Sequence, residues 1–423
     1  MNPLRRALLP DSARVGADGE LSIGGCDVAD LAEELGTPLF IYDTDHIRRR
    51  CREAVGAFGD TTVYAAKAFL CRAMAALAHE EGMRIDVSTL GELAVTLAAG
   101  VPGDRLVMHG NNKSMTELRA AIDAQVGVVV IDSFDEIARI EALVDAGAPP
   151  PVVMLRITPG VEAHTHEFVR TGHDDSKFGF TVSNGAAARA VDLVSQSPAM
   201  DLVGIHAHIG SQVFRAESVA DAVEVIAGFV VPLGLEELSI GGGLGVPYVN
   251  GESAPTITQW GEAIDATARQ AGFKGRIWAE PGRSIVASSA VTVYRVGTIK
   301  EIPGVRTYVA VDGGMSDNPR PILYGSGYET FLPRAVDAPR PREVRVVGKH
   351  CESGDILVRE AFVPDDLAVG DLLATPVTGA YGHSMGSNYN KVLRPPVVFV
   401  SDGEARLVVR RETVEDLLAT DLG

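Results

Sequence analysis

Cysteine is scarce in this sequence. Cys26, Cys51, Cys71 and Cys351 are scattered over 423 residues, without the close pairs that mark zinc sites or disulfide-rich domains. The spacing argues against a disulfide framework and is typical of reduced thiols in the cytoplasm.

Long apolar runs are also missing. No stretch approaches the roughly 20 apolar residues that a membrane helix needs. Near the start, Arg5-Arg6 is followed by only Ala7-Leu8-Leu9 before Pro10, which is too short for the apolar core of a signal peptide. We therefore expect a cytoplasmic protein.

Basic residues are the minority among the charges, with 38 lysines and arginines against 56 aspartates and glutamates, and a net charge of −18. A nucleic acid or an anionic membrane is a poor partner for such a protein. The rest is typical of a globular enzyme, with 46% hydrophobic and 22% charged residues. A length of 423 residues favours two domains.

Short apolar runs alternate with helical stretches from about residue 60 to 285, which predicts repeated βα units. The predicted strands are Thr62–Lys67, Arg84–Ser88, Arg105–His109, Val128–Asp132, Val152–Thr158, Val203–His208, Glu237–Gly241 and Arg276–Glu280. This pattern predicts an α/β fold, a (β/α)8 TIM-like barrel, with a doubly wound parallel sheet as the alternative.

After residue 290, turn residues separate short strands and little helix remains, which predicts a C-terminal all-β domain. Its predicted strands are Val291–Lys300, Thr307–Asp312, Arg342–Val347, Asp355–Phe362, Asp371–Thr375 and Pro396–Val400. We expect the barrel at residues 38–288 and the β-domain at 289–423. Residues 1–37 are expected to form an N-terminal segment that contributes to the β-domain.

Lys67 is the most informative single residue, because it lies in the apolar run 63–68. Burying an ammonium is costly unless it is paired or loses its proton, and a neutral amine attacks aldehydes. Lys67 is therefore a candidate Schiff-base former. The alternative is a strand-end lysine whose ammonium reaches water. Further ionisable residues fall at the ends of other predicted strands, where barrel enzymes carry their chemistry: Asp86, His109, Arg156, His208 and Glu280.

Two turns follow the last predicted barrel strands. The glycine-rich run 241–245 has bare amides that can approach a phosphate, although its spacing does not match a dinucleotide-binding fingerprint. The turn Glu280-Pro281-Gly282-Arg283 offers an acid for a protonated ring nitrogen and a guanidinium fork for a carboxylate.

His206 and His208 alternate on one face of the sixth predicted strand, so they could hold a metal ion. No further ligand motif supports that interpretation. We favour an imidazole that stacks on a planar cofactor, with Ser211 near its phosphate. Far downstream, Cys351 stands close to Glu352 and Asp355, which favours the protonated thiol and a role as proton donor.

Together these features resemble the fold type III, alanine-racemase-like family of pyridoxal-phosphate-dependent decarboxylases. The resemblance covers nearly the whole chain and depends on the ordered stretches 64–68, 109–113, 171–179, 208–212, 241–245, 280–283, 320–324, 351–355 and 379–381. One departure is Phe69, which stands where the family commonly has asparagine.

The resemblance implies a role for each matching residue. Lys67 would bind pyridoxal 5'-phosphate covalently, and Cys351 would return a proton to the substrate carbanion. Further cofactor contacts would come from His208, Ser211, Gly243, Gly245, Glu280, Gly282, Arg283 and Tyr381, and substrate contacts from Arg283, Arg320, Tyr324, Glu352 and Tyr381. Cys351 and Glu352 would reach the active site of the other subunit of a homodimer.

Arg320 and Tyr324, together with Glu352, favour a substrate that carries both a carboxylate and an ammonium at its far end. The resemblance therefore implies decarboxylation of meso-2,6-diaminopimelate to L-lysine and CO2, the last step of lysine biosynthesis, with no metal. An ornithine- or arginine-type decarboxylase is the alternative within the family. Alternatives from other classes are a metal-dependent barrel hydrolase and a non-catalytic cofactor-binding protein.

Overall fold

The chain forms two compact units. The computed structural model describes residues 4–17, 19–160, 175–208, 210, 212, 214 and 216–423, without the side chains of 216–220. The barrel unit comprises Arg50–Gly245 and Ala254–Ser284, and the β-unit comprises Met1–Arg49, Val246–Ser253 and Ile285–Gly423. None of the described helices is both long and apolar enough to cross a membrane.

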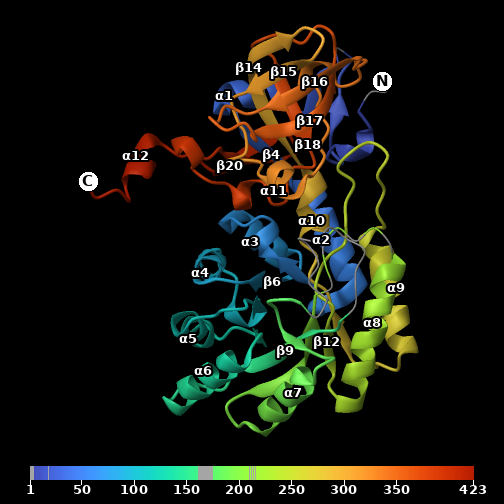
Figure 1. The fold of residues 1–423 in the computed structure, drawn as a ribbon, viewed down its shortest axis with the longest axis vertical. Coiled ribbons are helices and arrows are strands. Elements are labelled where there is room, and N and C mark those ends of the chain that lie inside the picture. Colours follow the sequence, from blue (N-terminus) through green and yellow to red (C-terminus); the bar gives the residue numbers. More distant parts are fainter. Residues whose placement is uncertain are drawn as a thin grey trace. The chain divides into compact units, whose positions relative to one another are not determined.

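Eight parallel strands and their helices build the barrel unit (Figure 1). In spatial order the strands are β5 (Val63–Ala65), β6 (Arg84–Val87), β7 (Leu106–Met108), β8 (Val128–Ile131), β9 (Val152–Thr158), β11 (Asp201–Ala207), β12 (Glu237–Ser239) and β13 (Arg276–Trp278), and β10 (Phe180–Thr181) pairs with β9. The helices are α2 (Thr44–Phe58), α3 (Arg72–Glu80), α4 (Leu90–Ala98), α5 (Met115–Asp123), α6 (Phe134–Asp145), α7 (Ala186–Gln196), α8 (Ala216–Val230), α9 (Ile257–Gln270) and α10 (Arg283–Val286).

The first and last strands meet and close the sheet. Thr62 and Ala279 form a parallel bridge, and the Val63 N–H donates to the Ala279 carbonyl at 2.9 Å. An open doubly wound sheet has no such junction, so the predicted (β/α)8 barrel is confirmed. Apolar side chains fill its interior and make it a packed core: Val63, Val107, Val128, Val130, Met154 and Trp278.

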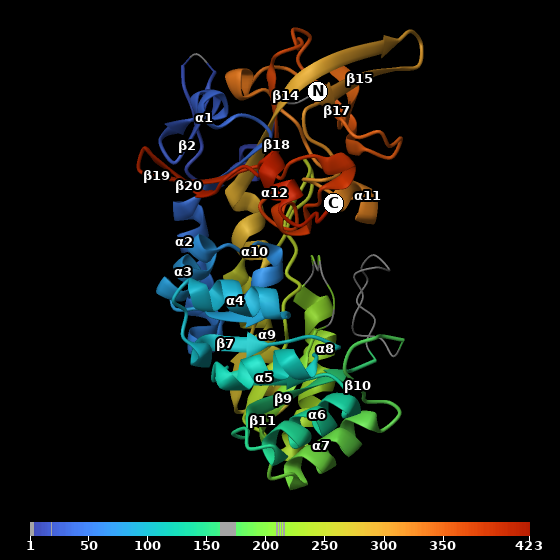
Figure 2. The same cartoon turned by 90° about the vertical axis from the view of Figure 1, so that its left-hand side faces the viewer.

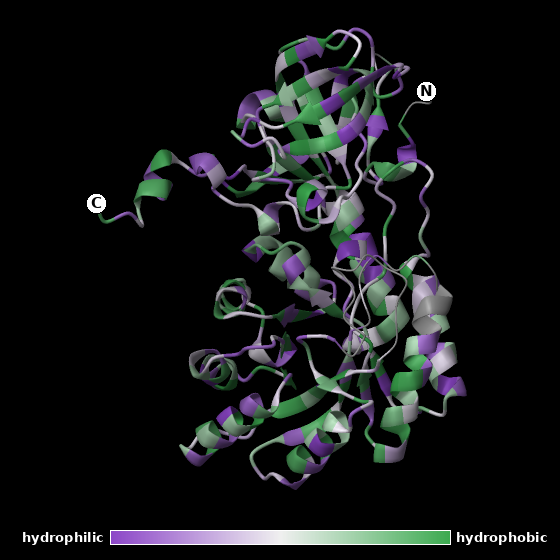
Figure 3. Ribbon diagram, in the orientation of Figure 1, coloured by the Kyte–Doolittle hydropathy of each residue, from purple (hydrophilic) through white to green (hydrophobic). Residues whose placement is uncertain are grey.

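Barrel helices bury one face, as α9 illustrates. Thr256 and Gln259 form a capping box at its start, in which each side chain accepts a hydrogen bond from the other residue's backbone N–H. Ile257, Trp260 and Ile264 follow at helical spacing and are buried. Both hydrophobic and hydrophilic residues are present on the barrel helices (Figure 3).

A mixed, mostly antiparallel sheet forms the core of the β-unit and confirms the predicted β-rich C-terminal region. Its order is β17 (Ile356–Val363), β16 (Arg342–Val347), β15 (Arg306–Val311), β14 (Ala290–Ile302), β4 (Leu39–Asp43), β19 (Val397–Ser401) and β20 (Glu404–Val409), and β18 (Leu372–Pro376) also pairs with β14. The long hairpin of β14 and β15 stands out in Figure 2. The unit also contains β1 (Arg14–Val15), β2 (Leu21–Ile23), β3 (Cys26–Asp27), α1 (Val28–Leu35), α11 (Arg320–Tyr324) and α12 (Val414–Leu418).

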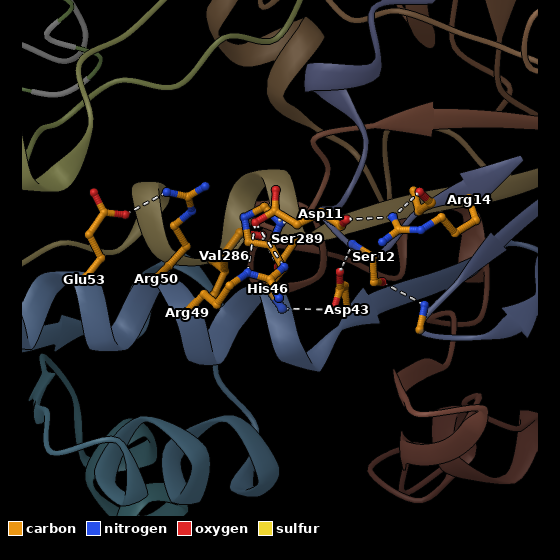
Figure 4. Close-up of polar contacts among 12 residues, drawn as sticks. Asp11, Ser12, Arg14, Asp43, His46, Arg49, Arg50, Glu53, Val286 and Ser289 are labelled. Atoms are coloured by element: carbon orange, nitrogen blue, oxygen red, sulfur yellow. Dashed lines mark hydrogen bonds and ion pairs between the residues drawn. The ribbon is translucent and has the colours of Figure 1, made fainter.

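Asp43, at the end of β4, ties the N-terminal segment to this sheet (Figure 4). It is fully buried, and its two carboxylate oxygens accept hydrogen bonds from the backbone N–H groups of Ser12 and His46, each at 2.9 Å. The Asp11 N–H in turn donates to His46 Nδ1 at 3.1 Å. One buried carboxylate therefore accepts hydrogen bonds from the N-terminal loop and from the first turn of α2.

Asp43→Ala should destabilise the β-unit, because two backbone N–H groups lose their acceptor in a buried site. We expect a loss of about 2–4 kcal/mol, at 1–2 kcal/mol for each group. Thermal unfolding and amide exchange at Ser12 and His46 measure it. Glu404→Ala, at an exposed position of β20, is the control, and a melting temperature of Asp43→Ala equal to that of the control would contradict the role.

Candidate active site

Lys67 lies just beyond β5, on the 3-10 turn Ala66–Ala68. Its side chain is exposed, whereas Ala66 and Ala68 are buried. The expectation of a buried strand lysine is therefore wrong, and the strand-end alternative describes the structure. The strand ends at Ala65, and the turn carries the long side chain out to solvent.

A different lysine, Lys113, is buried in the way that the sequence analysis expected for Lys67. Lys113, in the loop after β7, is 1% exposed, and its Nζ donates to the carbonyls of Gly110 and Val130 and to Glu136 Oε1 at 2.6 Å. Burial lowers the pKa of Lys113, and the Glu136 carboxylate opposes that shift. All three ammonium protons have acceptors, so this amine has a structural role. The sequence analysis missed it because its neighbours read as a polar loop.

Glu280, two residues beyond β13, is buried and closely surrounded by donors. Oε1 accepts a hydrogen bond from Ser239 Oγ at 2.9 Å and lies 3.4 Å from His109 Nε2, and Oε2 lies 3.2 Å from His206 Nε2. Burial alone would raise the pKa of Glu280, but the two histidines outweigh burial and hold it well below its usual range. The structure therefore contains a buried carboxylate that stays ionised.

The two histidines of the sixth barrel strand have different partners. Burial lowers the pKa of His206 to about 4, so its imidazole is neutral at pH 7 and can donate from Nε2 to Glu280. His208 Nδ1 accepts from the Gly242 N–H at 3.1 Å. Burial and the Lys67 ammonium hold the pKa of His208 well below its usual value, so this ring is also neutral. These two histidines therefore do not converge on one point as a metal pair would.

A different trio could satisfy metal geometry. Candidate ligand atoms of His109, His206 and Glu280 all lie within 4.8 Å of one another, and this is the one such group in the described part of the chain. The sequence analysis noted His109 at a strand end but missed Ser239, which also contacts Glu280. The signal for Ser239 was its place two residues before the glycine-rich run 241–245.

Glycine is required where the loop after β12 passes this site. A Cβ on Gly241, whose φ is +66°, would lie 2.6 Å from His208 Nδ1, and one on Gly242 would lie 2.3 Å from the Glu280 carbonyl oxygen. Gly243 and Gly245 follow in the same loop, with Gly243 at a φ of +118°. Gly282 and the buried Arg283 follow Glu280, and a Cβ on Gly282 would lie 2.8 Å from the Ala65 Cβ. Ser211 lies outside the described residues.

The remaining predicted residues belong to the β-unit. Arg320 and Tyr324 are on α11, where Arg320 is buried and Tyr324 half-buried. Tyr381 has a φ of +60°, a conformation that non-glycine residues adopt rarely and that often marks functional sites. Cys351 and Glu352 are exposed on the loop before β17. Asp355 anchors that loop, since its carboxylate accepts from the N–H groups of His350 and Met315.

Stability should fall as the pH falls from about 6.5 to about 4. The ordinary pKa of histidine is 6.5 and that of folded His206 is about 4, so in this window the unfolded chain binds a proton that the folded chain does not. His206 alone accounts for up to about 3 kcal/mol. His206→Gln, which can still donate to Glu280, should give a shallower decline of melting temperature with acid. His79→Gln is the matched control, and equal slopes for the two variants would contradict the assignment.

The chain is similar to known proteins of one class. The family model described as "Pyridoxal-dependent decarboxylase, pyridoxal binding domain" matches residues 44–287. The chain is 46% identical to the diaminopimelate decarboxylase of Mycobacterium tuberculosis H37Rv over 96% of this chain and 95% of that protein. It is 45% identical to that of Bacillus subtilis 168 over 98% of each chain.

Solved structures agree. The structure is similar to diaminopimelate decarboxylase from M. jannaschii, with a TM-score of 0.90, 31% identity and 98% of both chains covered. A second structure of that enzyme, in complex with L-lysine, also has a TM-score of 0.90. The protein is thus a pyridoxal-dependent decarboxylase by class. Within that class, the chain belongs to the diaminopimelate decarboxylase family.

The barrel residues fit pyridoxal phosphate. The turn after β5 presents an exposed amine at Lys67, and Glu280 supplies a buried anion for a protonated ring nitrogen. His208 offers a neutral planar ring, and the glycines at 241–243 leave backbone amides without side chains in the way of a phosphate.

Proposed function

We propose that the protein removes CO2 from meso-2,6-diaminopimelate and releases L-lysine, with Lys67 as the residue that binds pyridoxal phosphate. Support comes from family membership over nearly the full chain. It also comes from one geometric observation, that Lys67 and Glu280 follow the two strands whose pairing closes the barrel.

Bound pyridoxal phosphate supplies a sink for the electron pair that remains when CO2 leaves. The role of Glu280 is to keep a proton on the ring nitrogen, which its ionised state favours. The role of His208 is to hold the ring flat against a neutral imidazole. Gly243, Gly245, Gly282 and Arg283 are proposed to bind the phosphate, with Ser211 and Tyr381 as further cofactor contacts.

The β-unit residues are proposed to bind and protonate the substrate. Arg320 and Tyr324, with Arg283, bind carboxylate, and Glu352 binds the distal ammonium. Cys351 then donates a proton to the carbon that has lost CO2. We propose a homodimer in which Cys351 and Glu352 act at the partner's barrel, and a cytoplasmic location, in keeping with four free cysteines.

The alternative of a metal-dependent hydrolase has one observation in its favour, the trio of His109, His206 and Glu280, and the family match outweighs it. Its distinguishing result is stoichiometric metal in the purified protein. The ionised Glu280 serves equally as the partner of a pyridinium, and the family match favours that role.

Cys351→Ser should keep bound cofactor and its visible absorbance but slow CO2 release from meso-diaminopimelate by about 100-fold or more, the usual contribution of a general acid. The assay measures CO2 release from meso-diaminopimelate, ornithine, arginine and lysine, by the variant and by the unmodified protein. Cys26→Ser, which replaces a buried cysteine of β3, is the control. Unchanged turnover in Cys351→Ser would remove it from the acid role. Equal CO2 release from ornithine or arginine would contradict the proposed substrate.

A further inference from the structure

Arg320 is a buried cation of the β-unit. Its residue is 4% exposed, and among the residues that the structure describes no aspartate or glutamate forms an ion pair with it. A buried guanidinium is costly to leave without a counter-charge. A site of this kind is therefore adapted to an anion that arrives from outside the chain.

Arg340, in the same unit, shows the contrasting arrangement. It is 3% exposed, and its Nη1 pairs with Glu329 Oε2 at 2.9 Å and also donates to the Thr330 carbonyl. Its charge is therefore neutralised within the fold. The two arginines are equally buried, so burial alone does not explain why Arg320 has no acidic partner in the described part of the chain.

Two tyrosines take the place of a carboxylate around Arg320. Its Cζ lies 4.1 Å from the centroid of the Tyr248 ring and 5.5 Å from that of Tyr328. Arg320 Nη1 also donates to the Tyr328 hydroxyl at 2.5 Å. The two rings pack edge to face at 5.3 Å and are themselves 3% and 4% exposed.

Ring faces attract a cation without cancelling its full charge. They fix the guanidinium in one orientation, while the positive charge stays available to a ligand. An acidic residue in their place would neutralise Arg320 and weaken its attraction for a carboxylate.

We propose that Tyr248 and Tyr328 are positioning residues that hold Arg320 to bind the substrate carboxylate that survives the reaction. This inference rests on the proposed function. The product is L-lysine, so the surviving carboxylate is the one on the L carbon, far from the bond that breaks. The tyrosines thereby contribute to the preference for a substrate with a second carboxylate over a substrate whose far end carries only an amine.

The test compares two competitive inhibitors of the holoenzyme, L-lysine, which has this carboxylate, and cadaverine, which lacks it. Tyr248→Leu removes a ring face, and Tyr328→Phe removes the hydrogen bond alone. Each should raise the KM for meso-diaminopimelate and the Ki of L-lysine by about fivefold to thirtyfold. The Ki of cadaverine and kcat should stay within about twofold.

Tyr248→Phe keeps the ring and should restore L-lysine affinity to within about threefold of the unmodified protein. Tyr308→Leu, on β15 of the same unit, controls for general loss of an aromatic residue. In an Arg320→Met background, Tyr248→Leu should have no further effect on the L-lysine Ki.

Equal losses of affinity for L-lysine and cadaverine would overturn the inference. Unchanged affinity for both inhibitors in Tyr248→Leu and in Tyr328→Phe would also overturn it. If Tyr248→Leu does not fold, the Tyr328→Phe comparison still decides. Failure of the proposed function would look different, because the unmodified protein would then release no CO2 from meso-diaminopimelate.

Discussion

Closure of the barrel is the constraint on which the candidate site depends. The pairing of β5 with β13 brings the turn after each strand to the same edge, through hydrogen bonds from Val63 to Ala279 and from Ala65 to Pro281. Lys67 stands two residues beyond β5, and Glu280 stands two residues beyond β13. The amine of Lys67 therefore follows the first strand of the barrel, and the carboxylate of Glu280 follows the last.

Charge at this edge is arranged by burial and by close partners. The imidazole of His206, which is neutral at pH 7, and the hydroxyl of Ser239 are close partners of Glu280, whose carboxylate keeps its negative charge. Lys113 is the opposite case, because a buried glutamate and two carbonyls occupy its ammonium fully. Lys67, by contrast, is exposed. Arg320 in the β-unit is also surrounded by close partners, but these are ring faces, which leave its positive charge available to a ligand.

Much of the fold could be predicted from the sequence, because strand and helix periodicities were strong. Val152–Thr158 and Arg342–Val347 match their strands residue for residue, and all eight barrel strands were found. Most of the other predicted barrel strands ran too far at their C-terminal ends, since polar residues such as Lys67 and Glu280 step out of the strand. β4 and β20 were missed, the first because it precedes the alternating region and the second because its burial is only partial.

The parts of the site that depend on distant partners could not be predicted. Lys113 looked like a loop residue until Glu136, on the following helix, supplied its counter-charge. Tyr248 and Tyr328 carry no motif, and only the fold brings their rings to Arg320. Lys67, conversely, was singled out by its sequence context. Its expected burial was wrong, and its role in binding the cofactor stays a prediction.

Reduction of the holoenzyme with borohydride, followed by peptide mapping, tests the central claim most directly, because it fixes the cofactor to whichever amine it has joined. The account predicts a single pyridoxyl-modified peptide, with the modification on Lys67 and none on the buried Lys113. A modification on any other lysine, or a reduced protein without bound pyridoxyl group, would contradict it.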